Sequence, residues 1–264
     1  MTKFNLDEIR RHWEAQVEKH RQSPAASWSD TTVIEMEIRE LLKYIENGDL
    51  VLDAGCANGY STIQLAIQRN LRILGIDYLP GMIEQANENL QQFKDKIAGS
   101  ISFETGDVMA IAKPAYLYDK VIIKRVIASL GEYDNQLKGI RECARVLKPG
   151  GLLLLSDATL QGWNKLNAFR REWQLPEISM PVFNNYLDRE KMVEDLSAEL
   201  ELLESGNFAS TYYVGTRILK PLLIRALGLE IDAADPQMEW NRWFSLLPSW
   251  GDYGTQELFV FRKK

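Results

Sequence analysis

A loop of small residues follows an apolar run near residue 50, and its composition suits a ligand site. The run at 50–53 ends in Asp53, and Gly55, Ala57 and Gly59 follow before a helix expected at 61–69. In open α/β sheets, ligands bind in the crevice outside the carboxyl ends of the strands, so this loop is a candidate binding site. The structural alternative is that the two glycines only permit a tight strand-to-helix turn.

The loop lacks the third small residue of a dinucleotide-binding motif. That position is Tyr60, where the motif needs a residue small enough for close helix–strand packing. In addition, the Asp53 carboxylate at the strand end would repel a pyrophosphate and favour an ammonium group. We therefore expect the loop to accept the amino-acid end of a ligand and not a diphosphate.

Asp77 is the second candidate, because it ends the next expected strand, 22 residues after Gly55. Folds of this kind place an acid there that accepts hydrogen bonds from both ribose hydroxyls. The alternative role is N-cap of a helix expected at 80–93. Tyr78 is expected against an adenine and Met82 beneath the ribose, although such residues also serve as core packing.

Asp107 and Val108 follow the third expected strand. The carboxylate can accept from the exocyclic amine of adenine, while the Val108 backbone N–H can serve a ring nitrogen. Each of these signals is weak alone. Together they describe a nucleoside with an amino-acid tail.

The elements that position these residues alternate regularly between short apolar strands and amphipathic helices. This alternation predicts a doubly wound, mostly parallel sheet covered by helices on both faces. The expected strands are 50–53, 72–76, 101–104, 119–124 and 152–156, and the expected helices are 61–69, 80–93 and 132–147.

The two ends of the chain depart from this alternation. Residues 1–47 are expected to form a helical cap, and 48–264 one domain with acceptor-facing insertions at 159–187 and 209–254. The first insertion is expected to be irregular, because it is rich in Trp, Pro and Asn. A helix at 188–199 and a strand near 200–205 then resume the core, and 257–261 is expected as an antiparallel edge strand.

Composition limits the classes of binding partner and the cellular location that we expect. Lys and Arg total 31 against 37 Asp and Glu, a net charge of −6, which gives no attraction towards nucleic acid. No apolar run approaches the roughly 20 residues of a membrane span and no signal peptide is visible, so we expect a cytoplasmic protein without membrane contact. Cys56 and Cys143 fit neither a disulfide framework nor a zinc site, and no cluster has metal-ligand spacing.

The motif set resembles the class I S-adenosylmethionine-dependent methyltransferases over residues 49–158. Asp53, Gly55, Ala57 and Gly59 match the family's first motif, with Ala57 where the family usually has glycine. The remaining matches are Asp77, the segment 106–108, the segment 123–125 that includes Lys124, and the turn 147–151.

The resemblance implies a Rossmann-like sheet of seven strands with an antiparallel last strand. It also implies S-adenosylmethionine as methyl donor and S-adenosylhomocysteine as product. The donor-binding residues it implies are Asp53, Gly55, Ala57, Gly59, Asp77, Tyr78, Met82, Asp107, Val108 and Lys124.

A second resemblance, around Leu166, Asn167 and Arg170, is to bacterial methyltransferases of surface-polysaccharide and natural-product pathways. It implies a small-molecule acceptor, anionic or sugar-like, methylated on oxygen or nitrogen. The chain departs from that subgroup at Lys124, where an acidic residue tends to precede the arginine matching Arg125.

Methyl transfer from a sulfonium is an in-line displacement that depends mainly on positioning and exclusion of water. Arg125, at the end of the fourth strand, is the main catalytic and acceptor-binding candidate, since guanidinium can hold an anion at two points. Its structural alternative is a surface ion pair with Glu132. His12 and Asp157 are further catalytic candidates, and Arg170, Tyr212 and Tyr213 are candidates to complete an anion-binding pocket.

Three functional classes remain open at this stage. The first is a small-molecule methyltransferase. The second is an RNA or protein methyltransferase, which should show a basic face or an Asn/Asp-Pro-Pro-Tyr/Phe motif after strand four. At that place this chain has Ile123-Lys124-Arg125-Val126-Ile127 instead of the motif. The third is a donor-binding protein without catalysis, which turnover would separate from an enzyme.

Overall fold

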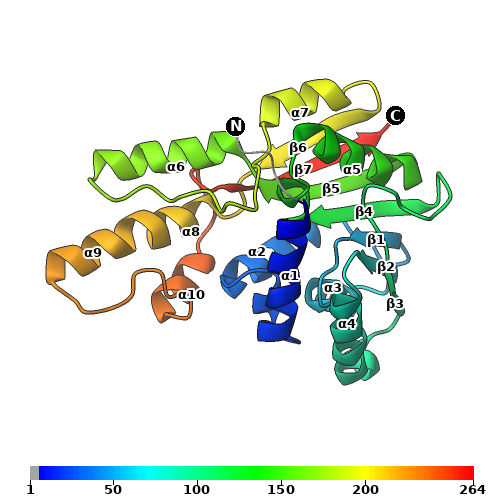
Figure 1. Ribbon diagram of the computed structural model, residues 1–264, viewed down its shortest axis with the longest axis horizontal. Coiled ribbons are helices and arrows are strands. Elements are labelled where there is room, and N and C mark those ends of the chain that lie inside the picture. Colours follow the sequence, from blue (N-terminus) through cyan, green and yellow to red (C-terminus); the bar gives the residue numbers. More distant parts are fainter. Residues whose placement is uncertain (1–5) are drawn as a thin grey trace.

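The computed structural model describes residues 6–264, which fold around one seven-stranded sheet (Figure 1). The strands lie in the order β3-β2-β1-β4-β5-β7-β6, and only β7 runs antiparallel to its neighbours β5 and β6. The predicted sheet with an antiparallel last strand is therefore confirmed. The strands are β1 Leu50–Ala54, β2 Arg72–Asp77, β3 Ser100–Thr105, β4 Tyr118–Lys124, β5 Leu147–Ala158, β6 Leu200–Gly206 and β7 Gln256–Lys263.

The order of the strands reverses between β1 and β4. From β1 the chain moves outward to β2 and β3, and then returns to place β4 and β5 on the other side of β1. This switch point opens a crevice at the carboxyl ends of β1 and β4, where open α/β sheets bind their ligands.

Helices cover both faces of the sheet, which explains why its central strands are continuous apolar runs. Val121, Ile122 and Ile123 of β4 are fully buried between two apolar clusters, one under each face. The helices on one face are α2 Thr31–Leu41, α3 Tyr60–Gln68 and α4 Pro80–Phe93, and those on the other are α5 Tyr133–Val146 and α7 Arg189–Leu196 (Figure 1).

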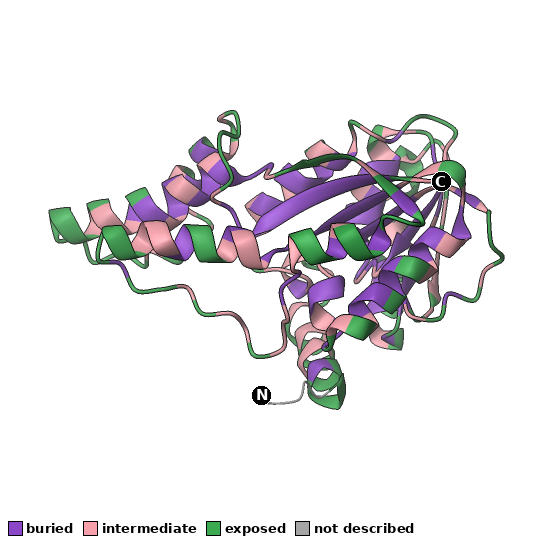
Figure 2. Ribbon diagram, turned by 90° about the horizontal axis from the view of Figure 1, so that it is seen from above, coloured by how far each residue is buried: buried purple, intermediate pink, exposed green. Residues whose placement is uncertain are grey.

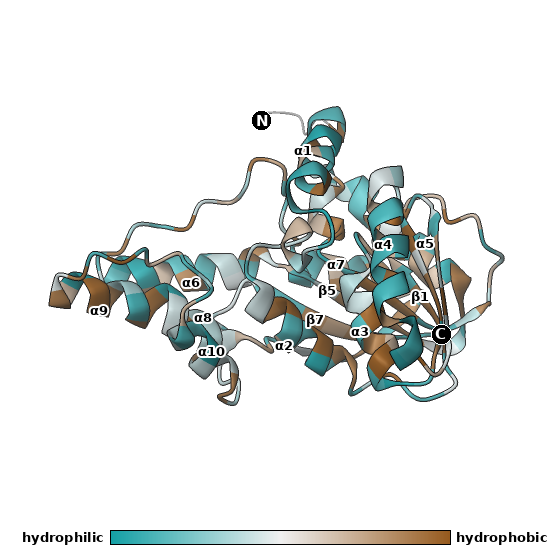
Figure 3. Cartoon of the chain, turned by 90° about the horizontal axis from the view of Figure 1, so that it is seen from below, coloured by the Kyte–Doolittle hydropathy of each residue, from teal (hydrophilic) through white to brown (hydrophobic). Residues whose placement is uncertain are grey.

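The N-terminal helix α1, Leu6–His20, lies outside these layers and contacts α4 and the short helix η1, Pro24–Ala26. Figure 3 shows α1 as largely hydrophilic, in contrast with the hydrophobic strands of the sheet. Of its residues only Ile9 is fully buried. The helix therefore packs on the outside of the domain and contributes little to the main core.

Two sequence-based expectations about the C-terminal half are wrong. Residues 159–187 are not irregular throughout, because α6 spans Leu160–Glu172, begun by the Thr159 hydroxyl, which accepts from the Gly162 N–H. The last strand is not at an edge, since β7 lies between β5 and β6 and β6 forms the edge. Pairing on both sides explains why the β7 residues 256–261 are buried.

The second insertion builds a helical arm together with α6. It contains α8 Ser210–Val214, the π-helix η4 Gly215–Leu219, α9 Lys220–Leu227 and α10 Glu239–Ser245. Figures 1 and 2 show α6 and α9 extending away from the sheet, with exposed residues at the far end.

Candidate active site

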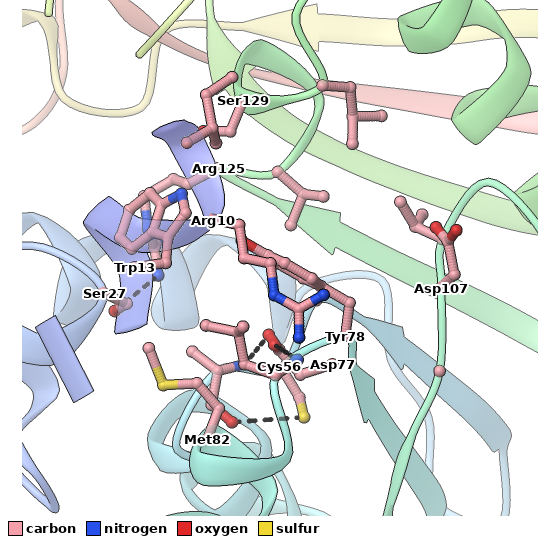
Figure 4. A pocket seen from close by; sticks show the side chains of 18 of the residues that line it. Arg10, Trp13, Ser27, Cys56, Asp77, Tyr78, Met82, Asp107, Arg125 and Ser129 are labelled. Carbon is pink, nitrogen blue, oxygen red and sulfur yellow. Dashed lines mark hydrogen bonds between the residues drawn. The ribbon is translucent and has the colours of Figure 1, made fainter. Parts of the chain in front are cut away.

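A cavity of about 280 Å³ occupies the switch point of the sheet. It gathers residues from the loops after β1, β2, β3 and β4, and α1 closes its outer side (Figure 4). Eight of the ten predicted donor-binding residues line it: Gly55, Ala57, Asp77, Tyr78, Met82, Asp107, Val108 and Lys124.

The loop after β1 adopts a conformation that few residues tolerate. Gly55 has φ +82°, and a Cβ there would lie 2.1 Å from the Val126 side chain, so only glycine fits. Ala57 has φ +49°, an uncommon value for a residue with a side chain. Glycine would reach this conformation more easily, which accounts for the family's usual residue at position 57.

Asp77 is anchored so that its carboxylate faces the cavity. Its two oxygens accept hydrogen bonds from the backbone N–H groups of Ala57 and Leu79, each at 3.0 Å. Burial raises the pKa of Asp77 to about 6, while the two N–H donors act in the opposite direction. The side chain thus links the loops after β1 and β2 and keeps lone pairs available for a ligand.

Asp53 does not line the cavity. It is fully buried beneath the loop, where it accepts from the Thr62 hydroxyl at 2.6 Å and from the Lys124 ammonium at 2.5 and 2.6 Å. Lys124 therefore both pairs with this carboxylate and lines the cavity. A buried ion pair with both partners present fixes the ends of β1 and β4 relative to each other. Gly59 also lies outside the cavity lining, against Phe103 and Ala86.

The remaining predicted donor residues occupy different parts of the wall. Met82 and Val108 are buried, whereas Tyr78 is 39% exposed. Asp107 is exposed, and its side chain accepts from the Met109 N–H at 2.8 Å, which holds the loop after β3. The wall is therefore apolar near Met82 and Val108 and polar at both carboxylates.

Residues of α1 complete the cavity, and sequence reasoning missed them. Ile9, Arg10 and Trp13 line it, and Figure 4 shows the side chains of Arg10 and Trp13. Asn58 ties this N-terminal segment to the loop after β1, because its side-chain amide donates to the backbone carbonyls of Arg21 and Ser23 at 2.8 and 2.7 Å. The amphipathic pattern of α1 was the available signal, but it does not identify which body residues the helix faces.

Arg125 lies at the end of β4 with φ +58°, another strained backbone position at the cavity. Its guanidinium forms an ion pair with Glu37, not with Glu132, and contacts the Ser27 hydroxyl at 3.4 Å. Burial lowers the pKa of Arg125 to about 10, so the group stays cationic at neutral pH. Its Nε has no hydrogen-bond partner among residues 6–264.

A second cavity, of about 390 Å³, adjoins the first and shares Trp13, Ser27, Arg125 and Ser129 with it. The predicted catalytic candidates His12 and Asp157 line this second cavity. Asp157 accepts from the backbone N–H groups of Ile127 and Ala128 at 2.8 and 3.2 Å, and burial raises its pKa to about 6.

The candidates Arg170, Tyr212 and Tyr213 line neither cavity. Arg170 donates to the backbone carbonyls of Pro176 and Arg217 within the arm. Tyr213 is buried and accepts from the Thr255 hydroxyl at 3.1 Å. The geometry of these three residues suits support of the arm and gives them no access to either cavity.

Tyr212 joins a buried polar network. Its hydroxyl donates to Asp30 at 2.8 Å and accepts from the Asn241 amide at 2.8 Å, while Arg217 pairs with the same carboxylate.

Tyr212→Phe should therefore lower the free energy of unfolding by about 1–2 kcal/mol, because two buried groups lose a partner. Urea denaturation measures this, with the exposed Tyr116→Phe as control. Unchanged stability together with lost turnover would instead return Tyr212 to the substrate site.

Within residues 6–264, no group of three or more His, Cys, Asp or Glu side chains is placed to hold a metal ion. In the same range, no helix has both the length and the apolar composition needed to cross a membrane. The two cysteines are free and buried, and burial raises the pKa of both thiols.

Comparisons with known proteins agree with this geometry. Residues 45–207 match the family described as "Methyltransferase domain". The chain is 34% identical over 113 residues to "27-O-demethylrifamycin SV methyltransferase" of Amycolatopsis mediterranei, covering 43% of this chain and 40% of that protein. It spans about half the length, or less, of the curated relatives it matches.

Solved structures of similar fold are more distant in sequence. The "[4+2]-Cyclase SpnF" superposes with a TM-score of 0.57 at 20% identity, covering 86% of this chain and 81% of that one. "Geranyl diphosphate methyltransferase in complex with SAM" gives 0.53 at 13% identity, covering 86% and 84%. These likenesses show the fold alone, whereas the family match covers more than half of the sequence. The chain belongs to the methyltransferase-domain family.

Proposed function

We propose that the protein transfers a methyl group from S-adenosylmethionine to a small-molecule acceptor, with the donor bound in the first cavity. The observation that carries this proposal is that eight predicted donor residues, from the ends of four strands and the segments that follow them, line one cavity. Their chemistry fits the parts of the donor: the Asp77 carboxylate suits the ribose hydroxyls, and the apolar wall near Met82 and Val108 suits the adenine.

A small-molecule acceptor fits both the charge and the relatives. The net charge of −6 gives no electrostatic attraction to nucleic acid, and the first relative is named for methylation of a small molecule on oxygen. The fold does not fix the reaction, because one neighbour is described as a cyclase. Turnover must therefore be tested as well as binding.

The residues of this chain contribute positioning and shielding. The Asp77 carboxylate orients the ribose, the loop at 55–59 approaches the amino-acid end, and α1 closes the cavity against water. When bound, the donor supplies an electrophilic methyl carbon on its sulfonium. An acceptor aligned behind that carbon displaces the thioether in line.

Calorimetric titration with S-adenosylhomocysteine tests the donor site. We expect binding at pH 7.5 and weaker binding as the pH falls through about 6, because the ionised Asp77 accepts hydrogen bonds from both ribose hydroxyls and protonation removes one acceptor. Absence of binding at pH 7.5 contradicts the proposal. Donor-dependent mass gain of one methyl group in a metabolite extract then separates an enzyme from a protein that only binds.

A further inference from the structure

The second cavity differs from the first in the composition of its walls. Four aromatic side chains line it: Trp13 of α1, Trp28 after η1, and Phe183 and Tyr186 from the segment before α7. Its volume of about 390 Å³ falls within the range of roughly 300–1,000 Å³ typical of small-molecule sites. Walls of this kind favour a flat, largely apolar ligand, which they can stack against.

The segment 181–186 is held firmly against the body of the protein. The Asn185 backbone N–H donates to the Ala128 carbonyl at 2.7 Å and its side chain donates to the Gly131 carbonyl at 2.8 Å. The Ser129 hydroxyl donates to the Asn184 side chain at 3.1 Å. This wall is therefore preformed, although the sequence of the segment gave no such indication.

His12 projects into this cavity from α1. Its ring stacks on Phe183 with a centroid distance of 3.9 Å and an interplanar angle of 20°, and meets Trp13 edge-on at 5.1 Å. Two aromatic neighbours fix the orientation of the imidazole. Partial burial lowers its pKa, which favours the neutral ring that can accept a proton.

The charged and titratable groups that face the same cavity come from several elements. Lys19 and His20 lie on α1, Arg125 follows β4, Asp157 ends β5, and Tyr186 lies in the segment before α7. Arg125 already pairs with Glu37, and Asp157 already accepts two backbone N–H groups. Among these groups, His12 combines a favoured neutral form with fixed ring geometry.

We infer that the second cavity holds the acceptor, that this acceptor is a planar aromatic alcohol, and that His12 is its general base. The inference rests on the proposed function, because Trp13, Ser27, Arg125 and Ser129 border both cavities and an acceptor in the second would face the donor in the first. His12 takes the proton of the hydroxyl, the oxygen forms a bond to the methyl carbon, and the carbon–sulfur bond breaks with its electron pair on sulfur.

Variants of α1 test the location of the acceptor. Gln16 lines only the second cavity, so Gln16→Trp should fill it, whereas Ala15 is exposed on the same helix and Ala15→Trp is the matched control. The probes are 1-naphthol, 2-naphthol, catechol and 4-hydroxybiphenyl, titrated into protein saturated with S-adenosylhomocysteine. We expect at least one to bind, at least tenfold more weakly in Gln16→Trp, and unchanged in Ala15→Trp.

The same experiment distinguishes a failure of the donor-site proposal from a failure of the acceptor-site proposal. Loss of S-adenosylhomocysteine binding in the wild-type protein contradicts the donor site itself. If the donor product binds but no phenol does, or if Gln16→Trp and Ala15→Trp bind the phenols equally, the donor site stands and the acceptor site is refuted.

A pH profile of turnover tests the base. With the phenol that binds best, wild-type kcat should increase with pH and level off above the pKa of His12, because only the neutral imidazole acts as a base. His12→Gln should lower kcat at pH 7 by about 10²-fold or more. In His12→Gln the rate should then rise with pH towards the pKa of the phenol, as hydroxide replaces the base. Arg11→Gln, which is exposed on the same helix and lines neither cavity, should match wild type. Equal pH profiles for wild type and His12→Gln would refute the role of His12 as base.

Discussion

Asp77→Ala is expected to weaken binding of S-adenosylhomocysteine by about 1.5–3 kcal/mol, a factor of roughly 10–150. The charge-assisted pair of hydrogen bonds to the ribose is lost, and we assign a total in this range to the pair, because water can partly replace the lost acceptor. The backbone N–H groups of Ala57 and Leu79 lose their acceptor at the same time, which loosens the loop that the donor contacts. Calorimetric titration at pH 7.5 measures the change.

The control for this effect is Asp107→Ala, because Asp107 lines the same cavity but is exposed to solvent. We expect its loss to weaken binding much less, since water can replace an exposed acceptor. Asp77→Asn keeps the shape and removes the charge, so it should fall between wild type and alanine. Unchanged affinity in Asp77→Ala would remove Asp77 from the donor site.

The sequence predicted most of the loop residues that meet at the first cavity, and the reason is physical. In a parallel sheet the carboxyl ends of the strands meet at one edge, so Gly55, Asp77 and Asp107 are brought together by the strand pattern alone. Local sequence therefore determines both the identity and the position of these residues. Asp53 and Gly59 were the exceptions. Whether the Asp53 carboxylate points to a ligand or to the buried Lys124 depends on tertiary contacts.

The acceptor side could not be predicted in the same way. His12 and Phe183 stack although they are far apart in the sequence, and their contact depends on how α1 and the segment 181–186 dock on the body. Tyr212 and Tyr213 show the opposite error, since aromatic composition suggested a substrate wall where the structure has a buried support. Composition alone does not distinguish aromatics that face a ligand from those that pack a satellite core.

The last strand and α6 illustrate the same limit at the level of elements. The apolar run at 258–261 predicts a strand but not its neighbours, so β7 was expected at an edge that β6 occupies. For α6 the usual boundary signals were present, with Thr159 as N-cap and Arg170 and Arg171 in the last turn. The tryptophan and proline residues of the segment nevertheless led to the prediction of an irregular structure.

The largest effect on stability is expected from Arg125→Ala. The partner Glu37 is buried, with its side chain 1% exposed, and it also accepts from the Ser156 hydroxyl at 2.5 Å and the Gln256 amide at 3.4 Å. Removal of the guanidinium leaves this carboxylate without its counter-charge. Breaking a buried pair in this way typically costs about 3–5 kcal/mol, so urea denaturation should show a loss of that size.

The double variant Arg125→Met/Glu37→Gln separates folding from function. It removes both charges and keeps similar volumes, so most of the lost stability should return. Arg125 borders both cavities, whereas Arg189 pairs with the buried Glu257 away from them, which makes Arg189→Ala a control for a broken ion pair. If Arg125 orients the acceptor, turnover of the phenol by the double variant should stay at least tenfold below wild type even after its stability has returned. This factor corresponds to about 1.4 kcal/mol of transition-state binding. The affinity for the donor should be unchanged. Recovery of turnover together with stability would show that Arg125 serves only to hold Glu37 and the end of β4.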